Sequence, residues 1–160
     1  MQIETTIAND RRRMKSGDYD ALFTRGHCFI FALRLNALAK LSIRGMETHE
    51  PGKIGHVWCL FEKGGKPQGV DIRGIYPEKA LMCWALGWSK RCKDIGPPRD
   101  VDVAEVEAAI EEKKLPPDFK DEVCILAGRI ILEHERFKDL WKSPVSAENE
   151  AQLINCIEDS

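Results

Sequence analysis

The spacing of apolar residues in the first half of the chain predicts one helix followed by paired strands. Over residues 28–41 the apolar positions recur every three or four residues, the period of an amphipathic helix. A short strand is predicted over 42–46, and two longer strands over about 55–62 and 68–73. Residues 63–67 between the longer strands contain two glycines and a proline, a turn signal, so we expect a hairpin.

The second half of the chain reads as helical. Pro77 suits the first turn of a helix that continues to about residue 86, and residues 93–100 form the clearest linker. Helices are then predicted over about 102–114, 118–141 and 147–157, while residues 1–20 form an N-terminal helix or a partly ordered arm. We therefore predict a single domain over 1–160 of the α+β class, with a helix packed on a small antiparallel sheet and C-terminal helices over 101–158.

Composition and charge narrow the classes of partner. With 160 residues, 43% of them hydrophobic, the chain is long enough to bury a core as one domain. The formal net charge of −2 gives no general attraction to nucleic acid or to an anionic membrane, and we expect neither as a partner. The N-terminus carries no pattern of a secretory signal, so a cytoplasmic location is the default expectation, with export by another route left open. The sequence gives no prediction of the oligomeric state.

The six cysteines fit reduced, separate thiols rather than a structural cross-link. They form no CxxC pair, and four of them lie within apolar helical or strand patterns. We therefore expect buried thiols, with neither a disulfide framework nor a zinc site built from closely spaced ligands. No organic cofactor is expected.

Three residues in the first half carry the candidate chemistry. Cys28 stands at the predicted start of the first helix, His56 near the start of one hairpin strand, and Asp71 in the other strand. A thiol, a histidine and an aspartate in this order are what a cysteine nucleophile, its general base and the orienting group of that base need. We expect the hairpin register to set His56 directly opposite Asp71 on one face of the sheet.

The predicted elements also suggest how the thiol is activated. A free thiol is largely protonated at neutral pH, but the partial positive charge of a helix N-terminus and a protonated His56 both favour the thiolate of Cys28. The backbone N–H of Cys28 is then available to stabilise an oxyanion. Gly26, His27 and Trp58 are further candidates for contacts with substrate or oxyanion, and Trp58 is alternatively a shield for the histidine or a core residue.

Rival assignments remain for the base and for the aspartate. His49, in the polar loop before His56, is a second candidate base. Arg73 shares the predicted face of Asp71 and is a competing partner for that carboxylate. His134 is expected to be a structural histidine of a helix, and Cys59 a core residue that faces away from His56.

The sequence resembles a known family in three segments, at residues 26–35, 55–58 and 69–74. These segments, which read GHCFIFALRL, GHVW and GVDIRG, are similar to the core motifs of papain-like cysteine hydrolases in their compact bacterial form, related to the NlpC/P60 and transglutaminase-like groups. The resemblance implies Cys-His-Asp catalysis by Cys28, His56 and Asp71. It also implies a protein or peptide amide as substrate and an acyl-thioester intermediate.

The chain departs from the papain pattern before the cysteine. It has no Gln between Gln2 and Gln68 and no Trp near Cys28, so the second oxyanion donor is unassigned. The leading hypothesis is a cysteine peptidase, amidase or deamidase, and an amine acceptor in place of water would make the same site a transamidase. A non-catalytic interaction module on this fold is the alternative from another class. A metal site formed by His27, Cys28, His56 and Asp71 is a third, weaker hypothesis.

Overall fold

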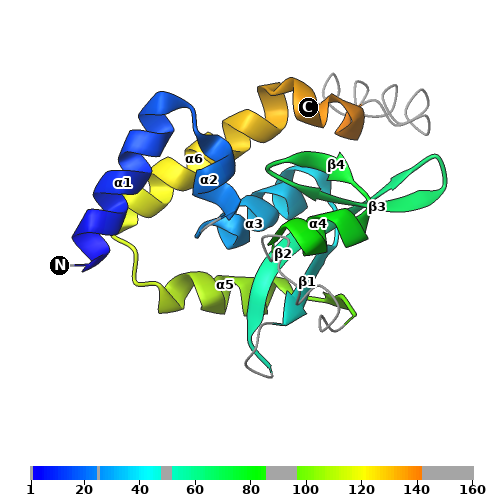
Figure 1. Ribbon diagram of the computed structural model, residues 1–160, viewed down its shortest axis with the longest axis horizontal. Coiled ribbons are helices and arrows are strands. Elements are labelled where there is room, and N and C mark those ends of the chain that lie inside the picture. The colour runs from blue at the N-terminus through cyan, green and yellow to red at the C-terminus, as the bar shows by residue number, and fades with distance from the viewer. Residues whose placement is uncertain (1, 25, 48–51, 86–96, 142–160) are drawn as a thin grey trace, which may run out of the picture.

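A five-stranded antiparallel sheet flanked by helices forms the centre of the molecule (Figure 1). The computed structural model describes residues 2–24, 26–47, 52–85 and 97–141. The predicted mixture of helices with an antiparallel sheet is thus confirmed, and the strand order is β4-β3-β2-β1-β5. The strands are β1 (Ile43–Glu47), β2 (Ile54–Lys63), β3 (Lys66–Asp71), β4 (Gly74–Tyr76) and β5 (Arg99–Asp100).

The helices lie mainly before and after the sheet in the sequence. The N-terminal segment forms the helix that was one of its two predicted states, and a short second helix before the cysteine was not predicted. The helices are α1 (Gln2–Ser16), α2 (Tyr19–Thr24), α3 (Cys28–Ala39), α4 (Glu78–Ala85), α5 (Val103–Glu112), α6 (Pro117–Glu133) and the 3₁₀ helix η2 (Glu135–Leu140).

Two predicted elements need correction. The predicted 118–141 helix is interrupted at His134, whose extended backbone ends α6 and whose side chain caps the 3₁₀ helix η2. The segment read as a linker contributes β5, which pairs with β1, so its described part extends the sheet. The helix predicted over 147–157 lies outside the described residues.

The hairpin of β2 and β3 turns on two glycines. Gly64 and Gly65 both have positive φ, 60° and 78°, a geometry that suits a two-residue hairpin turn and that glycine adopts without steric cost. The strands pair as Lys63 with Lys66 and Cys59 with Val70. Continuing this register sets Asp71 level with Trp58, so the prediction that Asp71 lies directly opposite His56 is wrong. The shift amounts to two residues along the strand, and His56 and Asp71 stay on the same face.

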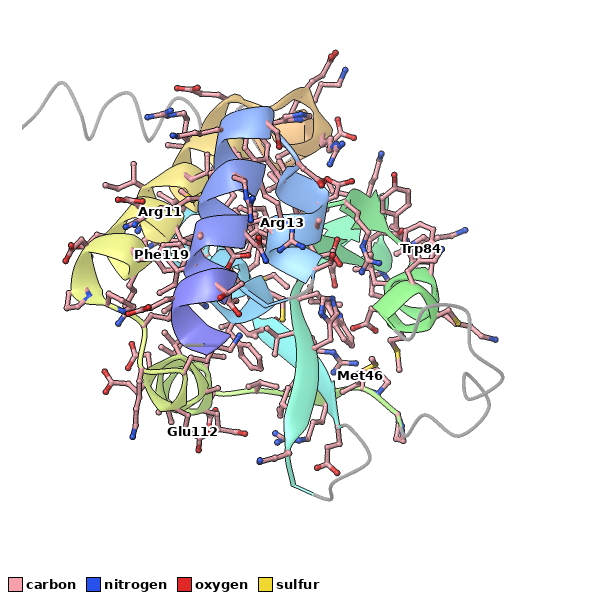
Figure 2. The ribbon with its side chains drawn as sticks, turned by 60° about the vertical axis from the view of Figure 1, so that its left-hand side comes forward. Arg11, Arg13, Met46, Trp84, Glu112 and Phe119 are labelled. Carbon is pink, nitrogen blue, oxygen red and sulfur yellow. The ribbon has the colours of Figure 1, made fainter. Side chains whose placement is uncertain are left out.

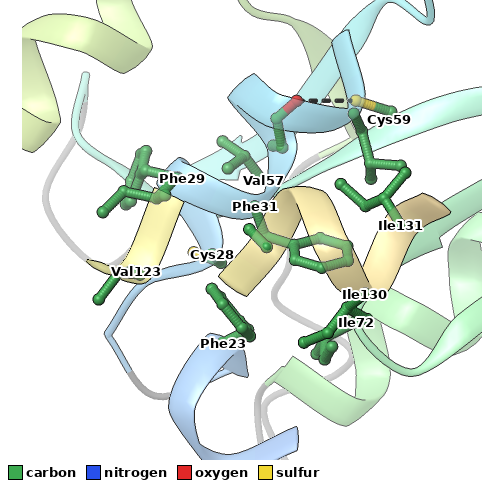
Figure 3. Packing of buried hydrophobic residues seen from close by; sticks show 14 of the residues in the cluster. Phe23, Cys28, Phe29, Phe31, Val57, Cys59, Ile72, Val123, Ile130 and Ile131 are labelled. Carbon is green, nitrogen blue, oxygen red and sulfur yellow. Dashed lines mark hydrogen bonds between the residues drawn. The ribbon is translucent and has the colours of Figure 1, made fainter. Parts of the chain in front are cut away.

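Alternation along the hairpin divides the buried side chains between two clusters. One strand face turns Val57, Cys59, Val70 and Ile72 toward α3 and α6, where they join the main core (Figure 3). The other face places Trp58 against Leu81 and Met82 of α4. Burying each large apolar side chain stabilises the fold by roughly 1.5–3 kcal/mol, so both faces of the sheet are anchored. α3 is consequently fixed against β2, the strand that carries His56.

Candidate functional site

The thiol of Cys28 lies at the first residue of α3. His27 precedes it as the N-cap and makes no side-chain cap hydrogen bond. Phe29, Ile30 and Phe31 bury α3 within the main core, so the helix packs beside β2. The placement of Cys28 at a helix N-terminus is confirmed, and the partial positive charge there favours a thiolate.

His56 and Asp71 meet across the sheet by a diagonal contact. Nε2 of His56 lies 3.2 Å from Oδ2 of Asp71, and both side chains are buried. Diagonal neighbours on adjacent strands are within reach of long or aromatic side chains, which explains how the imidazole contacts a carboxylate that is not directly opposite. The predicted association of these two residues is therefore confirmed although the predicted register is wrong.

The electrostatics link Cys28 to His56. Burial alone would raise the pKa of the Cys28 thiol, but the charge of His56 and a hydrogen bond from His56 outweigh burial and lower that pKa. A hydrogen bond from the Val57 backbone N–H and the charge of Lys113 also lower the Cys28 pKa. Since Nε2 of His56 faces Asp71, Nδ1 is the ring nitrogen left for the thiol. The three predicted residues thus form a connected Cys-His-Asp set.

The pKa of His56 is shifted in the complementary direction. Burial lowers it, but the Cys28 thiolate and the hydrogen bonds with Asp71 and Cys28 outweigh that effect and raise the pKa from 6.5 to about 9. A lowered thiol pKa and a raised imidazole pKa together favour a thiolate–imidazolium pair near neutral pH. Such a pair is the reactive form of a cysteine nucleophile.

Asp71 has two cationic partners rather than one. Its carboxylate accepts hydrogen bonds from the Arg73 backbone N–H at 2.8 Å and from Arg73 Nε at 3.1 and 3.2 Å, in addition to the contact with His56. Burial raises the pKa of Asp71, but His56 and Arg73 outweigh burial and lower it. The competing pairing of Arg73 with Asp71 is therefore real, and it coexists with the His56 contact instead of replacing it.

Trp58 is a neighbour of His56 that does not reach the surface. Its side chain is fully buried, its ring lies 6.0 Å from the His56 ring, and its Nε1 donates to Glu78 Oε1 at 3.0 Å. Arg44 in turn donates to the same Glu78 oxygen at 2.9 Å. Trp58 is thus a buried neighbour that packs behind His56. It exposes no surface, so the structure does not support the predicted direct contact between Trp58 and substrate.

Gly26 and His27 differ in what they offer beside the thiol. A Cβ placed on Gly26 would have nothing within 4 Å, so there is open space next to this residue. His27 is buried, and its Nε2 lies 2.8 Å from Oδ2 of Asp10 in α1. Burial lowers the pKa of His27 despite the opposing effect of Asp10. His27 therefore ties α1 to the start of α3.

The triad side chains themselves are nearly inaccessible in this conformation. Cys28, His56 and Asp71 are 6%, 4% and 3% exposed. Two cavities lie close by: one of about 490 Å³ that includes Phe29 and Ile54, and one of about 370 Å³ that includes Gly26 and His27. Both include Lys113. The two cavities thus lie beside the start of α3, and neither is lined by Cys28, His56 or Asp71 themselves.

The remaining candidates have structural positions or lie outside the described part. His134 is exposed and accepts a hydrogen bond from the Arg136 backbone N–H, so it caps η2. Cys59 is fully buried, its pKa is raised by burial to about 12, and its Sγ contacts the Ala32 carbonyl at 3.3 Å (Figure 3). His49 lies outside the described residues, as do Cys92 and Cys156.

Neither a metal cluster nor a membrane span is found in the described part of the chain. Over residues 2–24, 26–47, 52–85 and 97–141, no three His, Cys, Asp or Glu side chains are arranged to hold a metal ion. Of the four hypothesised metal ligands, His27 directs its Nε2 at Asp10 instead. No helix within these ranges has the length and apolar character to cross a bilayer.

Sequence reasoning missed three residues around the site. Asp10 of α1 contacts His27, and Glu78 of α4 accepts a hydrogen bond from Trp58. Lys113, at the end of α5, donates a hydrogen bond to the Gly26 carbonyl. Each reads as an ordinary charged position of a helix. Only its burial or tertiary contact distinguishes it, and periodicity gives no signal of that.

Comparisons with protein-family models, curated proteins and solved structures found no match for this chain. The assignment of its function therefore depends on the geometry of Cys28, His56 and Asp71.

Proposed function

We propose that the protein is a cysteine hydrolase of the papain-like type that cleaves peptide, isopeptide or side-chain amide bonds. The supporting observation is the connected Cys28–His56–Asp71 set at the start of α3, with the thiol pKa lowered and the imidazole pKa raised to about 9. Burial in a core raises the pKa of a structural cysteine instead, as it does for Cys59.

The first half of the reaction consumes the thiolate. Sγ of Cys28 attacks the carbonyl carbon, a C–S bond forms, and the carbonyl π electrons move to oxygen, where the Cys28 backbone N–H donates a hydrogen bond. The C–N bond then breaks, and the His56 imidazolium gives its proton to the departing amine. The products of this half are a free amine and a thioester on Cys28.

The second half requires His56 to act as a base, and the change in its pKa on acylation supports this change of role. The charge of the Cys28 thiolate is a main cause of the raised His56 pKa. Acylation removes that charge, so the pKa of His56 falls and the neutral ring can take a proton from water. The resulting hydroxide attacks the thioester, the C–S bond breaks, and the carboxylic product leaves with the thiolate restored.

Alkylation of individual cysteines by iodoacetamide, followed by mass spectrometry across a pH series, tests the activated pair. We expect the Cys28 rate to rise at a pH well below that of an ordinary thiol. This advantage should disappear in His56→Ala and persist in His134→Ala, which removes an exposed histidine instead. If Cys28 reacts no faster than Cys124 at any pH, the thiol is structural and the interaction module becomes the better hypothesis.

Hydrolysis itself needs a second measurement. A panel of fluorogenic peptide and side-chain amides should include substrates that the wild-type protein turns over and Cys28→Ala does not. Cys28→Ala keeps a small apolar side chain at a buried position, so its thermal unfolding should stay close to that of wild type. An activated Cys28 without turnover of any amide, but with incorporation of a primary amine, would redirect the proposal to transamidation.

A further inference from the structure

Lys113 reaches the start of α3 from another helix. It follows the last residue of α5, and its Nζ donates a hydrogen bond to the carbonyl oxygen of Gly26, two residues before the nucleophile. The same Nζ lies 5.5 Å from the centroid of the Phe29 ring. A cation from α5 therefore contacts the residues on either side of His27 and Cys28.

Lys113 also lines the cavity of about 370 Å³ beside Gly26 and His27. Two cations of this cavity, Arg13 and Lys113, accompany a single carboxylate, that of Asp10. The Asp10 carboxylate accepts a hydrogen bond from Arg13 at 3.0 Å and contacts His27 Nε2 at 2.8 Å. Figure 2 shows Arg13 on α1. The charge left over in this cavity is positive.

The cavity wall has room and an unmet polar group at Gly26 and His27, the two residues before Cys28. Space is open around Gly26, and Nδ1 of His27 is buried without a hydrogen-bond partner. Apolar side chains from α1, α2 and the segment after α5 complete the wall, namely Ile7, Ala21, Leu22 and Leu115. A small group with both polar and apolar parts fits such a lining.

The titration behaviour of the two groups is consistent with their proximity. Burial lowers the pKa of Lys113, and the charge of Cys28 opposes that change. In the other direction, Lys113 is one of the groups that lower the pKa of Cys28. The ammonium group therefore lies in the same electrostatic environment as the thiolate.

We propose that Lys113 is a specificity-determining residue that favours acyl donors carrying a carboxylate close to the reacting carbonyl, with that carboxylate held in the cavity beside Gly26. The inference builds on the proposed hydrolase function. It gives that function a substrate class: amides whose acyl part bears a free carboxylate, such as an acidic residue next to the scissile bond. The Lys113 ammonium pairs with the carboxylate and offsets the repulsion between it and the thiolate.

Two alkylating reagents that differ in charge test this directly. Iodoacetate and iodoacetamide both lose iodide to the Cys28 thiolate, and a C–S bond replaces the C–I bond in each case. Because both reagents react with the same thiolate, the fraction of Cys28 that is ionised cancels in the ratio of their rates at one pH. The ratio therefore reports the electrostatic potential that the reagent's charge meets at Cys28. The carboxylate of iodoacetate serves as the probe for the anionic group.

We expect the iodoacetate-to-iodoacetamide ratio at Cys28 to fall about fivefold in Lys113→Gln and Lys113→Met, the size expected for one charge at short range in a partly screened site. Lys113→Arg should keep the wild-type ratio. Lys114→Gln is the matched control, because it removes the same charge from an exposed neighbour, and its ratio should be unchanged. Two charge-removing variants are used so that a folding defect in one leaves the other measurable.

The outcomes separate the two proposals. An unchanged ratio in both charge-removing variants, or an equal fall in Lys114→Gln, would overturn the role of Lys113 while leaving the activated Cys28–His56 pair in place. A Cys28 that neither reagent labels in wild type would overturn the hydrolase proposal and this inference with it. A fall confined to the Lys113 variants would support the substrate class.

Discussion

His56 contacts Asp71 diagonally across the hairpin, with Nε2 and Oδ2 3.2 Å apart, while Trp58 occupies the position level with Asp71. Trp58 is fixed there by its hydrogen bond to Glu78. The imidazole is consequently held from two directions: by a carboxylate that also binds Arg73, and by an indole ring 6.0 Å away. Rotation of the ring away from Cys28 would break the contact with Asp71.

Asp71→Asn should weaken the nucleophile without removing it. The amide keeps the shape of the side chain but loses the charge that stabilises the His56 imidazolium. We expect the His56 pKa to fall and the alkylation rate of Cys28 at pH 7 to drop by about tenfold or more. Asp100→Asn, at an exposed aspartate paired with Arg44, is the control. An Asp71→Asn protein that alkylates at the wild-type rate would show that Asp71 serves only the structure.

Turnover of an amide substrate should depend on pH with two limbs. The rising limb follows formation of the Cys28 thiolate and should lie below the pH of an ordinary thiol, because the Cys28 pKa is lowered. The falling limb follows loss of the His56 proton that the leaving amine requires, at about pH 9. The pH profile of kcat/KM checks both. A profile that still rises above pH 10 would contradict the assignment of His56 as the proton donor.

Acid should destabilise the protein through Asp71. Its folded-state pKa is lowered, so its contribution to stability is fully present above the unfolded-state value near 3.8 and is lost as the pH falls through the folded-state value. Arg73→Gln removes one cause of that lowered pKa. The difference in the free energy of unfolding between pH 6 and pH 3 should therefore be smaller in Arg73→Gln than in wild type. Equal acid sensitivity would mean that Arg73 does not stabilise the Asp71 charge.

Gly69→Ala should disturb the packing of Trp58 behind His56. A Cβ on Gly69 would lie 2.5 Å from Leu81 Cδ1 and 3.1 Å from Trp58 Cδ1, so both side chains must move. Overpacking of this kind costs about 1–3 kcal/mol of unfolding free energy. Gly26→Ala is the matched control, since its Cβ meets nothing within 4 Å. Chemical denaturation of both variants measures the difference, and equal stabilities would contradict the packing described for Trp58.

The association of the three triad residues could be predicted because it depends on local patterns. The three- and four-residue apolar spacing places Cys28 at a helix start, and alternation within a hairpin places His56 and Asp71 on one face. The predicted register differs from the observed one at the turn, where Gly64 and Gly65 adopt positive φ. A two-residue glycine turn is itself a sequence signal, and it favours the observed pairing.

Contacts between distant segments could not be predicted in the same way. Asp10 meets His27 and Lys113 meets Gly26 across long stretches of sequence, and nothing in the pattern of α1 or α5 distinguishes these residues from solvated charges. The β5 pairing also depends on tertiary packing, since two residues are too few for a strand pattern. The fold determines these contacts, and a sequence pattern read locally does not contain them.

The buried pair of Asp10 and His27 sets a lower limit on how far the protein can be shortened. Cys28, His56 and Asp71 all fall within 44 consecutive positions, from 28 to 71, which would make that stretch an attractive minimal fragment for engineering. Yet removing α1 would leave the buried His27 ring, one residue before the thiol, without its carboxylate partner. A fragment that keeps this buried pair therefore includes the first helix, although that helix contributes none of Cys28, His56 and Asp71.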